Sequence, residues 1–335
     1  MKYARNDYAL DLEDDESELD ADKFIDPDRF IQHRYLSIKD TENRELKYSM
    51  KKCCVAFLDI LGFKTMISEN IDKVIFLLRY LRTFKEGYFR SPSNYEVWQD
   101  GLPKATMFSD SIILSCELDN WDDFTIFAES LAELQSGLLE HGILLRGGVE
   151  LGDLYHEDMY IFGEGLLAAY FLENEAVVPR ILVGEKLIEE LNQEFDRHIE
   201  DHFRWNGTYE GVDFEPSGES ILSTETGISP VTKQEKNYTY INYIRYALNG
   251  INPYYIKSND DWLKHIDLAE IDYTESITYI KKAIEEGLKI GDDHIRAKYE
   301  WLKDRYNGTL KMFLDQSRGE YKKKFIDIWS QRYIK

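Results

Sequence analysis

Two aspartates occupy positions where a carboxylate needs an explanation. Asp59 lies near the end of the apolar run CCVAFLDI, which begins at Cys53 and is typical of a buried strand. Asp110 lies between two short apolar runs, in the segment Ser109-Asp110-Ser111 that predicts a hairpin turn. If the two strands are neighbours, the carboxylates converge and form a site for a hard cation, Mg²⁺ or Mn²⁺. The alternative is that Asp59 caps a helix and Asp110 stabilises a turn.

Two further features favour binding of a polyphosphate. The segment Ile60-Leu61-Gly62-Phe63 predicts a strand–glycine–helix turn, and such a turn presents free backbone N–H groups to an anion. Arg146 is the only Lys or Arg between Lys104 and Arg180, a stretch that holds fifteen Asp and Glu residues. A guanidinium grips a phosphate through two parallel hydrogen bonds. The alternative for Arg146 is a structural ion pair with one of those acids.

Phe57 and Arg180 complete the candidates that spacing provides. Phe57 lies two residues before Asp59, so its ring is expected on the same face of the strand, where it would stack on a nucleobase. The alternative is an ordinary core aromatic. Arg180 lies in Val-Pro-Arg-Ile at the expected start of a strand, where the simpler interpretation is a surface arginine. The histidines His141 and His156 are isolated and lack metal-ligand spacing.

The elements that must position these residues alternate between strands and helices. Apolar spacing predicts helices at 66–81, 124–138, 163–173, 184–203 and 274–306, and strands at 53–60, 105–108, 112–116, 143–151, 154–162, 180–183 and 238–244. Residues 204–237 are polar and predict loops. The predicted order is a strand, a helix, two strands, a helix and a strand, which is the order of split β-α-β units. It predicts an α+β fold, a ferredoxin-like palm with helices on one face, followed by an additional helical C-terminal region.

Composition excludes several classes of protein. The 335 residues include 41 Lys and Arg against 63 Asp and Glu, a formal net charge of −22, which disfavours a nucleic-acid partner. There is no run of 18 apolar residues, so no membrane partner is expected. The N-terminal segment lacks the apolar stretch of a signal peptide. Three cysteines, two of them adjacent, cannot form a disulfide framework, and they indicate a reduced, cytoplasmic protein.

Shifts in charge and periodicity predict four segments. Residues 1–22 hold nine acids and two bases and are expected to form an acidic flexible tail. Residues 23–52 are a lead-in segment, residues 53–245 hold the candidate site, and residues 246–335 form the helical C-terminal region.

Taken in order, the candidate segments resemble the catalytic domain of class III nucleotidyl cyclases. The segment FLDILGF (57–63) resembles the first metal-binding strand and turn of that family, and FSDSI (108–112) resembles the hairpin that carries the second metal aspartate. The segment LRGGVELG (145–152) is similar to the strand whose arginine contacts the triphosphate. The segment YIFG (160–163), followed by a helix of small residues, resembles the part that contacts base and ribose.

Departures from the purine cyclases indicate a narrower resemblance. The positions that match purine-reading residues are Thr106 and Tyr160, and those that match the transition-state asparagine and arginine are Leu167 and Phe171. The chain is more similar to the pyrimidine cyclases of bacterial Pycsar anti-phage systems. That resemblance covers 53–306 and rests on FLDILGF, SDSI, the helix Gly163–Glu173, Pro179-Arg180-Ile181, Ile241-Asn242-Tyr243 and Lys298-Tyr299-Glu300-Trp301-Leu302.

The resemblance implies a role for each candidate residue. Asp59 and Asp110, with the Ile60 carbonyl, would hold two divalent cations, Mn²⁺ or Mg²⁺. The Leu61-Gly62-Phe63 turn and Arg146 would bind phosphates, and Arg180 would replace the missing transition-state arginine. The remaining nucleotide-binding residues would be Phe57, Thr106 and Tyr160, with Phe57 and Tyr160 as the wall around the pyrimidine.

The resemblance also implies partners. It implies a homodimer with two sites at its interface, UTP or CTP as substrate with UTP favoured, and a cyclic mononucleotide that activates a separate effector. Two alternatives stay open: a purine (adenylate or guanylate) cyclase, and a catalytically silent sensor that binds nucleotide and signals through the helical C-terminus. The joint presence of Asp59, Asp110 and Arg146 argues against the silent sensor.

Overall fold

The computed structural model describes residues 50–87, 103–118, 121–157, 160–193, 221–248, 273–316, 326 and 330–335. All of them belong to one compact unit, Met50–Lys335. The predictions for the tail (1–22) and for nearly all of the lead-in segment (23–52) lie outside the described residues, as does the predicted end of the helix near residue 203.

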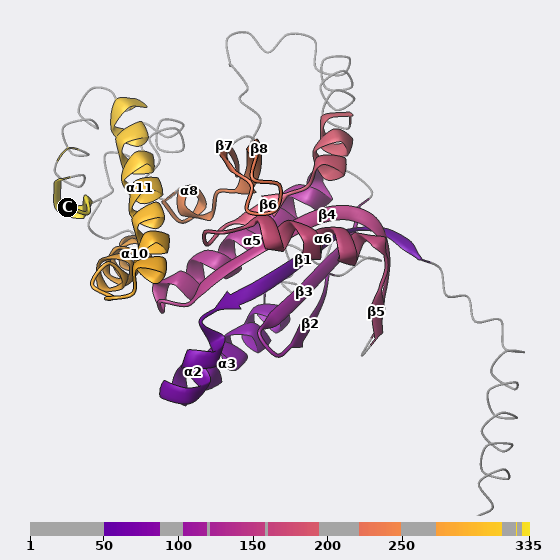
Figure 1. Ribbon diagram of the computed structural model, residues 1–335, viewed down its shortest axis with the longest axis horizontal. Helices are drawn as coiled ribbons and strands as arrows, with labels where there is room; N and C mark the ends of the chain where they lie inside the picture. The colour runs from indigo at the N-terminus through magenta and orange to yellow at the C-terminus, as the bar shows by residue number, and fades with distance from the viewer. Residues whose placement is uncertain are drawn as a thin grey trace, which may run out of the picture. The chain divides into compact units, whose positions relative to one another are not determined.

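A central, mostly antiparallel sheet organises the described chain (Figure 1). Four strands lie side by side in the order β2-β3-β1-β4, and each runs antiparallel to its neighbours in this order. Helices α2 and α3 lie between β1 and β2 in the chain, and α5 lies between β3 and β4. This is the strand order of a ferredoxin-like palm, so the predicted α+β fold is confirmed. The bounds are β1 Lys51–Leu61, α2 Phe63–Glu69, α3 Ile71–Gly87, β2 Lys104–Phe108, β3 Ser111–Glu117, α5 Trp121–Glu140 and β4 Leu144–Glu157.

The two faces of the palm sheet are covered by different helices. Alternate residues of β1, among them Ala56 and Leu58, face a large apolar core that includes Phe124 and Leu131 of α5. The opposite face, with Val55 and Phe57, is covered by α6 (Glu164–Glu175). Because Asp59 follows Val55 and Phe57 at a spacing of two, its side chain belongs to the α6 face.

Helix α6 approaches β4 closely because β4 carries glycines. A Cβ atom on Gly148 would lie 2.2 Å from Leu172 Cβ and 2.7 Å from the Ala169 carbonyl oxygen. Gly152 of β4 is packed equally closely against Gly165 of α6. The missing side chain of Gly148 therefore makes room for α6.

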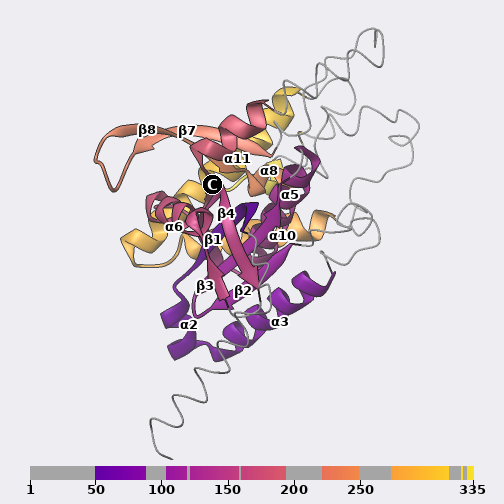
Figure 2. The same ribbon diagram turned by 90° about the vertical axis from the view of Figure 1, so that its right-hand side faces the viewer.

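The second half of the sheet differs from the sequence prediction. The predicted strand 154–162 is divided between the end of β4 and β5 (Tyr160–Phe162). The predicted loop 204–237 contains β7 (Leu222–Ile228) and the start of β8 (Glu235–Ile241), while 204–220 lie outside the described residues. Figure 2 shows the β7–β8 hairpin extending beyond the palm strands. Strand β6 (Ile181–Val183) pairs in parallel with β4 and joins β8 to the palm.

The C-terminal helices extend the layer formed by α5. Helix α8 (Tyr243–Leu248) and α10 (Tyr273–Gly287) pack against α5, and α11 (Asp293–Gln316) packs against both α8 and α10. The single helix predicted over 274–306 is therefore two helices, separated by a turn around Gly291. Most of the C-terminal region beyond Gln316 lies outside the described residues.

Candidate functional site

Asp59 and Asp110 are brought together at one end of the palm. Asp59 of β1 pairs in register with Ser111, the residue after Asp110. The Ile60 N–H donates a hydrogen bond of 2.9 Å to the Asp110 carbonyl oxygen, which fixes the β2–β3 turn against the end of β1. Ser109 in that turn has a φ of 57°, a left-handed conformation that makes the reversal tight. The strand adjacency on which the predicted carboxylate pair depends is therefore present.

Arg146 lies directly opposite Asp59 on the other neighbouring strand. The two residues are register partners of β4 and β1, and Arg146 Nε donates to Asp59 Oδ2 at 3.0 Å. Its terminal nitrogen Nη2 lies 2.8 Å from Glu173 Oε1 of α6. One guanidinium thus pairs with a carboxylate from a strand and a carboxylate from a helix. The two alternatives for Arg146 are therefore compatible, because it lies beside Asp59 and is also ion-paired there.

Glu173 is a site residue that the sequence analysis did not single out. It is only 5% exposed, and it points from the buried side of α6, which also carries Gly165 and Ala169, toward Arg146. Burial raises the pKa of Glu173, the Arg146 guanidinium lowers it, and the charges of Asp59 and Asp110 raise it again. All three carboxylates therefore share one electrostatic environment. A glutamate on the apolar side of a helix was the available sequence signal.

Lys298 of α11 adds a second cation to this environment. Its side chain is half-buried, and burial lowers its pKa. The charge of Arg146 lowers that pKa further, whereas Asp59 and Asp292 raise it. Lys298 is thus near enough for its charge to interact with those of Asp59 and Arg146. Spacing along the sequence could not indicate this, because Lys298 lies 239 positions after Asp59 and only the tertiary fold brings them near each other.

The site carries more negative than positive charge close to Asp59. Asp59, Asp110 and Glu173 provide three carboxylates, and Arg146 and Lys298 provide two cations, one of which already pairs with two of the acids. Among the residues that the structure describes, no group of three or more His, Cys, Asp or Glu side chains is arranged to hold a metal ion by itself. Two carboxylates with a neighbouring carbonyl are a donor set of hard oxygens, which fits a divalent cation that takes its other ligands from a substrate.

The predicted phosphate-binding turn has the strand–glycine–helix backbone that was expected, but the side chains of its flanking residues pack into the core. Gly62 has a φ of 77° and precedes α2, so the left-handed turn requires a glycine there. Phe63 is buried in the main core, and Leu61 packs against that core. Only the backbone of this turn is therefore available to an anion.

The predicted base-binding residues lie in two places. Phe57 and Thr106 belong to one row across the palm, because Phe57 and Thr106 both pair with Ile113. The Phe57 ring meets the ring of Tyr170 of α6 edge-on, at 5.2 Å between centroids. Tyr160 lies on β5 and is 68% exposed. Tyr170, which the sequence analysis did not select, is thus the aromatic neighbour of Phe57.

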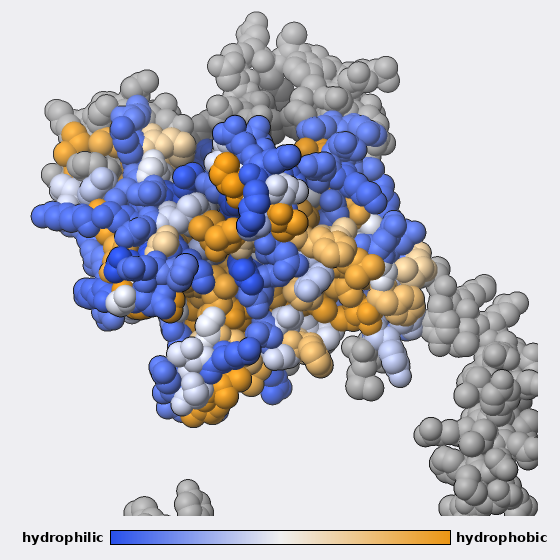
Figure 3. Space-filling model, in the orientation of Figure 1, coloured by the Kyte–Doolittle hydropathy of each residue, from blue (hydrophilic) through white to orange (hydrophobic). Residues whose placement is uncertain are grey.

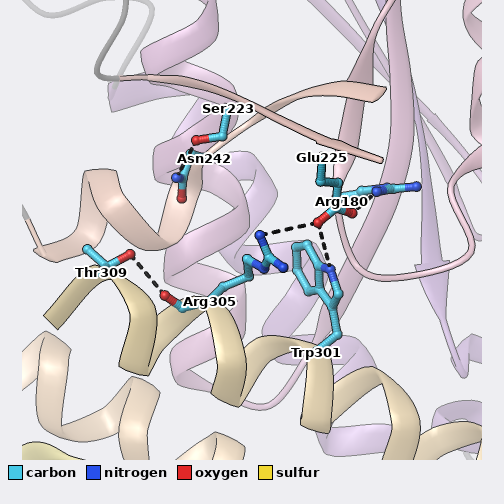
Figure 4. A network of polar contacts seen from close by, with 7 residues as sticks. All are labelled: Arg180, Ser223, Glu225, Asn242, Trp301, Arg305 and Thr309. Carbon is cyan, nitrogen blue, oxygen red and sulfur yellow. Dashed lines mark hydrogen bonds and ion pairs between the residues drawn. The ribbon is translucent and has the colours of Figure 1, made fainter. Parts of the chain in front are cut away.

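Arg180 lies in a different cluster from Asp59 and Arg146. It is 5% exposed at the start of β6, its guanidinium forms an ion pair with Glu225 of β7, and it lies 4.5 Å from the centre of the Tyr238 ring. Two residues of α11 also contact Glu225 (Figure 4): Arg305 Nη1 forms an ion pair with Glu225 Oε2 at 3.3 Å, and Trp301 Nε1 donates a hydrogen bond to the same oxygen at 3.4 Å. Burial lowers the pKa of Arg180, with Tyr238 and Tyr240 opposing that effect. This network ties the β7 strand and the C-terminal helix to the palm.

An apolar surface borders the site. Figure 3 shows apolar side chains gathered over α6 and the β4–β5 end of the sheet. The exposed large apolar residues of these elements are Tyr160, Phe162, Leu167, Tyr170 and Phe171. Leu167 and Phe171 are the residues that the sequence resemblance matched to the transition-state residues of purine cyclases. Their exposure on α6 makes them surface residues of the described chain.

Comparisons with known proteins identify no family by sequence. No family model matches the chain, and no curated protein matches it. Among solved structures, the chain is similar to a bacterial light-regulated adenylyl cyclase, with a TM-score of 0.35 and 10% identity over 58% of this chain and 92% of that one. It is also similar to the catalytic core of a rhodopsin–guanylyl cyclase with converted specificity, with a TM-score of 0.35 and 11% identity over 57% and 95%. Similarities this weak carry no functional argument, so the assignment depends on the chain's own side chains.

None of the helices in the described part of the chain combines the length and apolar character that crossing a membrane requires.

Proposed function

We propose that this chain is a nucleotide cyclase that converts a pyrimidine nucleoside triphosphate, UTP or CTP, to the 3′,5′-cyclic monophosphate and pyrophosphate. The observation that carries the proposal is the convergence of Asp59, Asp110 and Arg146 at one end of a palm sheet. The pyrimidine preference is supported by Thr106 and Tyr160 at the positions where purine cyclases carry purine-reading residues.

In the proposed reaction the ribose 3′-oxygen attacks the α-phosphorus in line. A 3′-O–P bond forms, the bond between the α-phosphorus and the bridging oxygen breaks, pyrophosphate leaves, and the hydroxyl proton passes to solvent. Two divalent cations, Mn²⁺ or Mg²⁺, would acidify the hydroxyl and neutralise the leaving oxygens. Asp59, Asp110 and the Ile60 carbonyl would hold them, and the phosphates would complete their coordination.

The remaining residues would bind and orient the substrate. Arg146 would release Asp59 and bind the β- and γ-phosphates, because a guanidinium pairs with phosphates as well as with carboxylates. Glu173 would keep Arg146 positioned, and Lys298 would add positive charge. The backbone of Leu61-Gly62-Phe63 would contact the phosphates, and Phe57, with Tyr160, would line the base. The transition-state role predicted for Arg180 would require it to leave Glu225, so its present contacts support a structural role instead.

A homodimer with sites at its interface fits the apolar surface over α6 and β5. Phe171 is 65% exposed and Leu167 is 58% exposed, and an apolar face of this kind favours burial against a second protein surface. The product would act as a second messenger for a separate effector in anti-phage defence, as the resemblance to Pycsar cyclases implies. The four-segment division of the chain, with residues 53–245 as the cyclase domain, belongs to the same proposal.

Incubation of the full chain with equal amounts of ATP, GTP, UTP and CTP and with Mn²⁺ tests the proposal. Mass spectrometry should find a cyclic pyrimidine mononucleotide. A cyclic purine product would make the chain a purine cyclase.

A catalytically silent nucleotide sensor is the second candidate. It is favoured by Leu167 and Phe171 at the transition-state positions and by the engagement of Arg180 with Glu225. Nucleotide binding measured by calorimetry, without turnover above background for any of the four triphosphates, would support the sensor.

A further inference from the structure

His156 lies between two hydroxyl side chains on the α6 face of the palm. Its Nδ1 atom is 2.7 Å from Ser115 Oγ of β3, and its Nε2 atom is 3.0 Å from Thr106 Oγ1 of β2. His156 and Ser115 are buried, with exposed fractions of 6% and 3%, whereas Thr106 is half-buried. The imidazole therefore connects a buried hydroxyl to one that keeps access to solvent.

Thr106 lies where a substrate held at Asp59 would place its base. Thr106 shares a row with Phe57, which is two residues from Asp59 along β1. Two residues along a strand and two strand spacings place Thr106 about 12 Å from Asp59, which is on the order of the length of a nucleotide. Its hydroxyl lies on the same face of the sheet as the Phe57 ring.

The direction of each contact depends on which ring nitrogen carries the proton. In the Nε2–H tautomer, Ser115 donates to Nδ1, and the shorter separation of 2.7 Å suits a hydroxyl donor. Nε2 then donates to Thr106 Oγ1 at 3.0 Å, a usual separation for an N–H donor. In this tautomer Thr106 accepts from the ring, and its own O–H proton is left to donate elsewhere.

We propose that His156 is a positioning residue for base selection: held by Ser115 as the Nε2–H tautomer, it leaves the Thr106 hydroxyl as a hydrogen-bond donor to the base. The inference rests on the proposed function for the presence of a nucleotide. A donor at this position favours the uracil 4-carbonyl, which accepts, over the cytosine 4-amino group, which donates. UTP is therefore the preferred substrate.

Two variants of Thr106 test the hydroxyl. Thr106→Val keeps the shape and removes the donor, so the preference for UTP over CTP in kcat/KM should fall about 3- to 10-fold, as for the loss of one hydrogen bond. Thr106→Ser keeps the donor and should retain most of the preference. An unchanged ratio in Thr106→Val would overturn the proposal.

Two variants of His156 separate positioning from structural support. His156→Gln can place an N–H donor near the Nε2 position and should retain the UTP preference, whereas His156→Leu cannot and should lower it. A structural role alone would lower activity on UTP and CTP equally, and such a result would overturn the proposal. Thermal unfolding of each variant identifies any loss that arises from misfolding.

Two measurements keep this inference distinct from the proposed function. In the wild-type chain, ¹⁵N NMR of the imidazole should report the Nε2–H tautomer, and an Nδ1–H tautomer would overturn the proposal whatever the activity. Calorimetry with UTP and with CTP should show tighter binding of UTP, lost in Thr106→Val, even if no product forms. If UTP binds more tightly but no product forms, the cyclase proposal fails and the assignment of His156 stands. Equal binding of UTP and CTP by the wild-type chain would overturn the assignment of His156.

Discussion

Arg146 Nε lies 3.0 Å from Asp59 Oδ2, and the two residues are register partners on β4 and β1. A carboxylate that accepts from a guanidinium has less capacity to ligate a cation. Under the proposed function, Arg146 and a divalent cation would therefore compete for Asp59 until a triphosphate drew the guanidinium away. In the structure the ion pair joins the ends of β1 and β4.

Replacement of Arg146 should separate metal binding from nucleotide binding. Arg146→Met removes the competitor, so Mn²⁺ should bind more tightly in the absence of nucleotide, while the triphosphate should bind at least about 10-fold more weakly because a charge-assisted hydrogen bond is lost. Electron paramagnetic resonance of free Mn²⁺ and calorimetry measure the two affinities. Arg79→Met, at an exposed position of α3, is the control and should change neither. Weaker Mn²⁺ binding in Arg146→Met would contradict the competition.

Glu173 should act through Arg146. Glu173→Gln replaces the ion pair of 2.8 Å with a neutral contact, so kcat/KM should fall about 10- to 100-fold, because loss of a charged partner at a buried group costs about 1–3 kcal/mol or more. Steady-state kinetics on the preferred triphosphate measures the loss. The control is Glu175→Gln on the same helix, whose carboxylate accepts from Tyr238 and Ser229 and not from Arg146. Equal losses in the two variants would show that Glu173 has no special role.

Glu225 should stabilise the junction of β7, β6 and α11. Glu225→Ala leaves the buried Arg180 guanidinium without its carboxylate, and breaking such a pair costs about 3–5 kcal/mol of unfolding free energy. Denaturant unfolding measures it. Glu185→Ala is the control, because Glu185 is 80% exposed and lies 3.6 Å from Lys236, so the loss should be below about 1 kcal/mol.

The same cluster tests the role predicted for Arg180. If Arg180 is structural, the double variant Arg180→Ala/Glu225→Ala should be less destabilised than the sum of the single variants, since neither charge is left alone. Activity should then follow the folded fraction. A folded Arg180→Ala protein with kcat lowered by orders of magnitude would instead assign Arg180 to the transition state.

Gly148 should be essential for the close packing of α6. A Cβ atom there would lie 2.2 Å from Leu172 Cβ and 2.7 Å from a backbone oxygen, so Gly148→Ala must displace the helix that carries Glu173. Stability and activity should both fall. Gly308→Ala is the matched control: its Cβ meets nothing within 4 Å in α11, and it should stabilise by about 0.5–1 kcal/mol. Thermal unfolding of both variants measures the difference, and an unaffected Gly148→Ala would contradict the packing.

The apolar surface over α6 should hold the proposed homodimer. Phe171→Glu places a charge in the middle of that surface, so sedimentation should show a monomer and activity should be lost. Ile75→Glu is the control, because Ile75 is also an exposed apolar residue, 42% exposed, but lies on α3. A dimer that survives Phe171→Glu would move the interface elsewhere.

Local pattern predicted the parts of the site that strands carry. Asp59 and Asp110 follow from an apolar run and a hairpin signal, and the helix predicted over 124–138 is the central part of α5, which Gly142, with a φ of 64°, follows. Both aspartates lie in local sequence patterns, so they are readable before the structure. The register that places Arg146 opposite Asp59 was not predicted, because the pairing of distant strands is not a local feature of the sequence.

Features that depend on tertiary packing were missed. Glu173 reaches the site because α6 packs on β1 and β4, and the charge of Lys298 acts there from α11. Helical spacing in the sequence does not indicate which element a helix packs against. Strand β7 has the sequence LSTETGI and lies at the edge of the sheet, where polar residues are tolerated, so its composition resembled a loop. The predicted strand 238–244 ends at Ile241, because the Asn242 side chain accepts from the Arg245 N–H and caps α8.

The central claim is that Asp59 and Asp110 are required for nucleotide cyclisation. Product formation from an equal mixture of the four triphosphates with Mn²⁺ tests it most directly. The wild type is compared with Asp59→Asn and Asp110→Asn, and Asp72→Asn on α3 is the control. The wild type and the control should form cyclic UMP as the main product, and the two site variants should form none above background while remaining folded. Full activity in folded Asp59→Asn or Asp110→Asn would contradict the account.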